Sequence, residues 1–136
     1  MRNFAHRVIS AEHRPDDSAD TEARAALRVC EKMRESLSAL VGSHGFRALL
    51  TRALSLAKAE AAWLGKLEVS ADGALVFPAE IENERGATEM TEGGIALVAQ
   101  MLELLVTFIG EALTRRLVQQ IWPEVAPGDA KSGGKT

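Results

Sequence analysis

The chain has 136 residues, 46% of them hydrophobic, and a formal net charge of −3. This length supports a single domain, and the hydrophobic content excludes a wholly disordered chain. The negative charge and an aromatic content of only 4%, with no Tyr, argue against nucleic-acid binding and against attraction to anionic lipid. A single Cys excludes an intrachain disulfide framework and fits a reducing cytosol.

The first 18 residues carry both basic and acidic side chains and lack the apolar stretch of a secretory signal. We expect residues 1–18 to form a flexible N-terminal segment. The longest apolar stretch, residues 95–110, is interrupted by Gln100, Glu103 and Thr107, so it is too short and too polar for a membrane span. The chain is therefore expected to be cytoplasmic, without a membrane partner.

A first helix is predicted from Asp20, a residue type that often caps helix N-termini, to about Leu40. Small and apolar residues recur in it with alternating spacings of four and three, the pattern of a coiled-coil seam. They are Ala19, Ala23, Ala26, Cys30, Met33, Leu37 and Leu40. Because Ala and Cys make up so much of the seam, it favours a helix that packs inside its own domain over a coiled-coil dimer.

Gly42-Ser43-His44-Gly45 predicts a break, followed by a second helix to about Leu64. Arg47 and Arg52 make this helix basic. Glu60 falls inside its apolar arc, which would raise the pKa of a buried carboxylate and suit a general acid, although pairing with a cation is the more ordinary interpretation. The break could also bind an anion through unpaired N–H groups, but a glycine C-cap followed by a serine N-cap explains it equally simply.

Two short alternating runs around Asp72-Gly73 predict a β-hairpin over residues 67–77, which Pro78 ends. The acidic residues 79–91 are expected to form a loop or one short helical turn.

The last helix is predicted from about Glu92 to Ile121. Up to Leu113 it is apolar on nearly all sides except for a narrow polar stripe that includes Glu103, Thr107 and Glu111, which predicts a central, mostly covered helix. Beyond Leu113 the apolar residues change to the side of the stripe. Either the stripe faces inward and its carboxylates find partners, or it meets solvent and the helix end packs on a second subunit.

Residues 124–136 read as a disordered tail. Its final residues are similar to a phosphate-binding loop, but Asp129 stands where that motif needs Gly and no helix follows, so no nucleotide is expected. The three histidines His6, His13 and His44 form no cluster with Cys, so we expect no metal, no cofactor and no catalytic residue.

Several short motifs recur together in the second half of the chain: Gly45-Phe46-Arg47-Ala48-Leu49, the run from Leu105 to Thr114, Leu117-Val118 and Trp122-Pro123. By these motifs, residues 42–123 resemble a family of small bacterial helical proteins. Because that family has no established activity, the resemblance implies a bacterial cytoplasmic protein and transfers no catalytic residue.

The sequence thus predicts a mainly α fold, with three long helices in residues 19–123 and a short β-hairpin between the second and the third. The favoured function is a small non-enzymatic interaction or regulatory module that acts by protein–protein association, as a homodimer or with another protein. The interface candidates are Val98, Met101, Leu105, Ile109 and Ala112.

Two alternative functions stay open. A small-ligand-binding or enzymatic domain would use the polar stripe, and a DNA-binding regulator would use a helix-turn-helix across residues 21–64. The ligand or ion-pair candidates are Arg47, Arg52, Glu60, Glu103, Thr107 and Glu111. A pocket that joins the stripe to an arginine would favour ligand binding, whereas a filled core with an exposed apolar patch would favour association.

Overall fold

A computed structural model describes residues 1–14, 16, 21–71, 73–76 and 87–125 of the chain. Its elements are helices α1 (Arg2–Glu12), α2 (Glu22–Ala57), α4 (Ala87–Ile109) and α5 (Glu111–Ile121), the 3₁₀ helix η1 (Ala62–Lys66), and strands β1 (Glu68–Val69) and β2 (Leu75–Val76). The predicted fold class is confirmed: the protein is mainly α, with a short antiparallel hairpin between α2 and α4.

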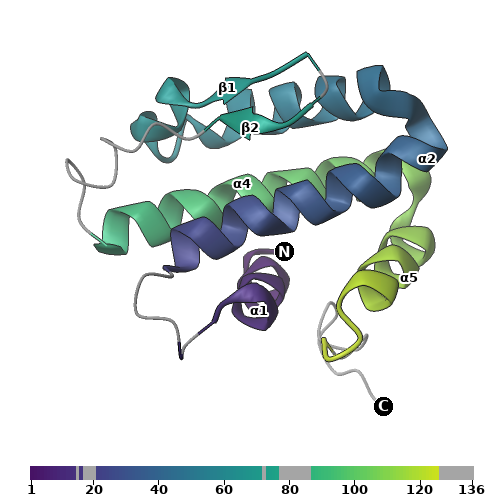
Figure 1. The fold of residues 1–136 in the computed structure, drawn as a ribbon, viewed down its shortest axis with the longest axis horizontal. Coiled ribbons are helices and arrows are strands. Elements are labelled where there is room, and N and C mark those ends of the chain that lie inside the picture. The colour runs from purple at the N-terminus through teal and green to yellow at the C-terminus, as the bar shows by residue number, and fades with distance from the viewer. Residues whose placement is uncertain (15, 17–20, 72, 77–86, 126–136) are drawn as a thin grey trace.

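The elements form three layers (Figure 1). The first part of α2 and α4 lie side by side in the middle, and α2 as a whole makes with α4 the most extensive contact between described elements. The second part of α2, with the hairpin, covers one side of this pair, and α1 and α5 cover the other.

Helix α1 lies where the sequence predicted a flexible segment. Phe4, Ala5, Val8 and Ile9 are buried, and their spacing places them on one face of a helix against α2 and α4. The helix has no side-chain N-cap bond and no acidic residue in its first turn, so the usual sequence marks of a helix start are missing. Residues 2–12 are therefore a docked helix and not a flexible segment.

Helix α2 bends back on itself at Gly42. The helix begins at Thr21, whose side chain accepts a hydrogen bond from the Arg24 N–H at 3.1 Å; the predicted cap, Asp20, lies outside the described residues. Gly42 adopts φ 79° and ψ 164°, a backbone region that is essentially restricted to glycine. The predicted break thus divides α2 into two segments, residues 22–41 and 43–57.

The hairpin pairs Glu68 with Val76 and Val69 with Leu75. Its turn is closed by a 2.8 Å hydrogen bond from the Ser70 N–H to the Ala74 carbonyl. Gly73 has φ 89°, and a Cβ there would lie 3.2 Å from the Phe46 ring, so the turn lies against the second segment of α2. Asp72 and residues 77–86, which include the predicted end of the second strand and most of the acidic loop, lie outside the described residues.

The predicted single helix over residues 92–121 is two helices, because Gly110 breaks it with φ 93° and ψ 158°. The helix also starts earlier than predicted, at Ala87. The break explains the change of apolar side after Leu113. A straight helix could not bury both sides in one small domain, whereas α5 turns at Gly110 and packs Leu117 and Val118 inward.

Glycines let α4 approach its neighbours closely. A Cβ at Gly93 would lie 2.5 Å from the indole of Trp63, and a Cβ at Gly94 would lie 2.9 Å from the Cβ of Ala26. The small residues of the α2 seam therefore serve close contact between helices inside the domain.

The chain after α5 also belongs to the core, since Trp122 and Val125 are buried. Of the predicted tail, residues 126–136 lie outside the described residues. Residues 88–109 form one helix long and apolar enough to cross a membrane, and 50% of its most apolar stretch is buried inside the molecule.

Candidate functional site

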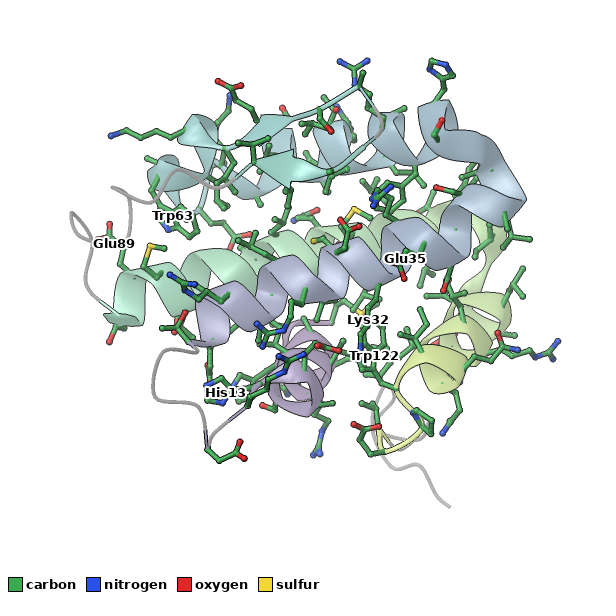
Figure 2. All side chains as sticks on the ribbon, in the orientation of Figure 1. His13, Lys32, Glu35, Trp63, Glu89 and Trp122 are labelled. Carbon is green, nitrogen blue, oxygen red and sulfur yellow. The ribbon has the colours of Figure 1, made fainter. Side chains whose placement is uncertain are left out.

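A buried carboxylate connects three parts of the chain. Glu12 ends α1, and its side chain is only 4% exposed. Its Oε2 lies 2.5 Å from the Lys32 Nζ and accepts a hydrogen bond from the Trp122 Nε1 at 3.0 Å. Its Oε1 lies 3.3 Å from the Arg28 Nε, and Arg28 also donates to the Glu12 carbonyl at 3.1 Å. Figure 2 shows Lys32 and Trp122 together on the side of α2 that faces α1 and α5.

The surroundings of Glu12 keep it ionised. Burial by itself would raise the pKa of this carboxyl, but hydrogen bonds from Lys32 and Trp122, the charge of Lys32 and the hydrogen bond from Arg28 lower it below the ordinary value of 4.5. Each oxygen has a donor and the group stays charged, so we interpret the cluster as a structural clamp and not as an acid–base centre.

Among the described residues, three of the five exposed large apolar side chains lie beside the two helix breaks, and the other two are Met1 and Val76. Leu40, just before Gly42, is 61% exposed; Phe108, just before Gly110, is 61% exposed; and Leu113, just after Gly110, is 42% exposed. Both breaks lie at the same end of the long axis of the molecule, the right-hand end in Figure 1. We call Leu40, Phe108 and Leu113 the apolar end.

The predicted polar stripe faces solvent. Glu103, Thr107 and Glu111 are all exposed. The Thr107 hydroxyl donates to the Glu103 carbonyl at 3.1 Å, and Glu111 pairs with Arg115 on the same helix. None of the four cavities described here is lined by Glu103, Thr107 or Glu111.

The remaining predicted ligand residues separate into two places. Glu60 is exposed three residues after the end of α2, where it forms a 2.9 Å ion pair with Arg2. Arg47 and Arg52 lie together on the outer face of α2, along a shallow groove of about 540 Å³. Because every residue that lines this groove belongs to one helix, the groove is an open surface.

The structure also separates the predicted interface residues. Val98, Met101 and Leu105 are completely buried within the chain's own core. Ile109 is half-buried and Ala112 is exposed, so only these two lie near the apolar end. The apolar pattern of the last predicted helix indicated that it is covered on most sides. It did not indicate that the uncovered residues would be those beside Gly110.

Metal ligation and thiol chemistry find no support. No group of three or more His, Cys, Asp or Glu side chains gathers among the described residues. Burial raises the pKa of the Cys30 thiol to about 12, with a smaller contribution from the charge of Glu31, so Cys30 behaves as a small apolar residue in the α2 seam.

A second cavity, of about 620 Å³, lies between α1 and residues 124–125. Asn3, His6, Arg7, Ser10, Ala11, Glu124 and Val125 line it. The side chains of Asn3, His6, Arg7, Ser10 and Glu124 are exposed, so no buried polar group is directed at a ligand there.

Comparison of the chain with protein-family models, curated proteins and solved structures found no match. Its function is therefore inferred from its own geometry.

Proposed function

We propose that the protein is a small non-enzymatic interaction module that associates with a second copy of itself through the apolar end. The observation that carries this proposal is the exposure of three large apolar side chains, Leu40, Phe108 and Leu113, which stand in sequence beside two helix breaks that lie at one end of the molecule. Exposed apolar residues gathered in one place commonly mark a protein partner.

The charges beside the apolar end suit a second copy. Glu103 lies five residues before Phe108 on α4, about one and a half turns away, and Arg116 lies three residues after Leu113 on α5. Both are exposed, and neither has an ion-pair partner among the described residues. A surface that carries both charge signs around an apolar centre can complement itself across a twofold axis.

A small anionic ligand on the groove of Arg47 and Arg52 is the second candidate function. It is supported because these two predicted ligand residues do lie in one groove, without ion-pair partners among the described residues. A saturable rise in melting temperature with inorganic phosphate, lost in Arg47→Ala, would support it.

We also propose a cytoplasmic location. Helix α4 is apolar enough for a membrane, but α1 and α2 bury much of it inside the domain, as expected for a core helix.

Light scattering on the purified chain at micromolar to 100 µM concentrations tests self-association. A dimer would have a mass of about 29 kDa, twice the 14.6 kDa of one chain. Phe108→Asp places a charge at the centre of the proposed interface and should shift the mass to that of a monomer while the helical circular dichroism stays unchanged.

Val76→Asp is the matched control, because Val76 is an equally apolar residue, 49% exposed, but lies on the hairpin and not at the apolar end. This variant should remain a dimer. A wild-type chain that stays at 14.6 kDa over the whole concentration range would overturn the proposal.

A further inference from the structure

The groove beside Arg47 and Arg52 continues past these two residues toward the end of α2. Its cavity of about 540 Å³ shares Thr51 and Ser55 with a neighbouring cavity of about 310 Å³. The neighbouring cavity is also lined from outside α2, by Leu64, Gly65 and Leu67. The two cavities therefore form one continuous groove, which we call the α2 groove, along the second segment of α2 as far as η1 and the start of the hairpin.

The two halves of the α2 groove differ in chemistry. The first half carries Arg47 and Arg52, which are both exposed. The second half has an apolar lining, since Leu54 is half-buried and Leu64 and Leu67 are buried. The groove therefore offers cations at one end and an apolar surface at the other.

Gly65 keeps the apolar half open. A Cβ at this position would lie 3.2 Å from the Cδ of Lys58, so the aliphatic part of the Lys58 side chain passes close to Gly65 and borders the groove. The φ of Gly65 is not positive, so the backbone accepts a larger residue there. A large side chain at position 65 would occupy the apolar half.

The charge of the groove is concentrated and is not neutralised within the described residues. Residues 43–59 contain Arg47, Arg52 and Lys58 and no acidic residue, in a chain whose net charge is −3. All three cations are exposed, and none forms an ion pair with a described acidic side chain. A local positive field on an acidic chain complements an acidic partner.

A protein segment suits this groove better than a nucleic acid or a membrane does. Three cations provide few phosphate contacts, and both polyanions depend on many such contacts. Glu68, which is exposed and follows Leu67 in the chain, would repel a long polyanion at the apolar end. A peptide, in contrast, can place carboxylates on the cations and a large apolar side chain in the apolar half.

We propose that the α2 groove binds an acidic segment of a partner protein, with its carboxylates on Arg47 and Arg52 and one large apolar side chain against Leu54, Leu64 and Leu67. This inference rests on the second candidate function, whose anion it identifies as protein carboxylates, and it does not depend on self-association. The centres of the two halves are roughly 10 Å apart along α2. Three residues of an extended segment span that distance.

Selection from a random 12-residue peptide library on the purified wild-type chain tests the proposal. The selected peptides should combine at least two acidic residues with a Leu or Phe about three positions away. Fluorescence anisotropy then measures the dissociation constant of one labelled peptide. Reversing both arginines, in the double variant Arg47→Glu and Arg52→Glu, should weaken its binding by about tenfold or more.

Two further variants separate the halves of the groove from the rest of the surface. Gly65→Leu fills the apolar half and should also weaken binding by about tenfold, while the cations stay in place. Arg116→Glu is the matched control, because Arg116 is an exposed arginine on α5, away from the α2 groove, and has no ion-pair partner among the described residues. This variant should bind the peptide as the wild type does, and circular dichroism should show the same helical content for all variants.

Each remaining outcome counts against the acidic segment. A selection that gives no peptides, or peptides that the double arginine variant binds equally well, would overturn the inference. Binding of inorganic phosphate without any acidic peptide would overturn it and leave the small-anion function in place. Tighter Arg47-dependent binding of oligothymidine or of phosphatidylserine vesicles would overturn it in favour of a nucleic acid or a membrane.

Discussion

At the scale of single residues, Glu12 has the clearest effect on stability. Its pKa is lower in the folded chain than its ordinary value of 4.5, so the folded state favours the ionised carboxylate. The stability that this provides is complete above pH 4.5 and is lost as the pH falls through the lowered pKa of the folded state.

Glu12→Gln should therefore lower the free energy of unfolding at pH 7 by about 2 kcal/mol, because a neutral amide compensates Lys32 and Arg28 poorly. At pH 3 the difference from the wild type should be smaller, since the wild-type carboxylate is then becoming protonated. Urea denaturation at the two pH values measures both. Glu35→Gln is the control, because Glu35 is exposed on α2, and it should change the free energy of unfolding little at either pH. An equal loss at both pH values would contradict the role given to the charge.

The sequence could not have shown this clamp. Glu12 and Trp122 are 110 positions apart, and no spacing in the sequence connects them. The same limit applies to Glu60, which the helical wheel placed in an apolar arc. The second segment of α2 ends at Ala57, so Glu60 lies beyond it and reaches Arg2 of a helix that the sequence did not predict.

At the scale of elements, the close approach of α4 to η1 depends on Gly93. The Trp63 ring is buried, and its Nε1 donates to the Glu89 carbonyl at 3.2 Å, so it cannot move aside for a Cβ placed 2.5 Å away. Gly93→Ala should lower stability by about 1–3 kcal/mol, although alanine favours a helix by about 1 kcal/mol.

Urea denaturation followed by tryptophan fluorescence measures this loss. Gly65→Ala is the control, because the nearest atom to its Cβ, at 3.2 Å, is the Cδ of Lys58 in a flexible side chain. A Gly93→Ala variant as stable as the wild type would show that α4 does not approach Trp63 as closely as described.

Some elements were predictable because their signals are local. Asp72-Gly73 between alternating runs indicated the hairpin, and the apolar length of α4 indicated a central helix. Helix α1 was missed because its first turn carries no capping signal. The break at Gly110 was missed because a lone glycine is tolerated within helices. The change of apolar side after Leu113 was the one sequence signal that indicated it. Val98, Met101 and Leu105 were predicted as interface residues because the apolar pattern of one helix does not show which of its sides its own domain covers, and in the structure all three are buried.

At the scale of the whole molecule, association should be visible as a dependence of thermal stability on concentration. If folding and dimerisation are coupled, raising the chain concentration from 1 to 100 µM should raise the melting temperature by about 3–6 °C. Phe108→Asp should abolish this dependence, whereas Val76→Asp should retain it. Scanning calorimetry at several concentrations measures it, and a melting temperature that stays constant for the wild type would argue against a dimer in this range.

The hydrogen bond between Glu12 and Trp122 also has a consequence for how the chain folds during its synthesis. Ribosomes add about 5–20 residues per second, so roughly 5–22 s pass between the synthesis of position 12 and that of position 122. During that interval α1 and the first segment of α2 are already made, and Glu12 can pair with Arg28 and Lys32 but not with the indole. The carboxylate can therefore meet its two cations before Trp122 is made, and the indole is the last of its hydrogen-bond donors to be synthesised.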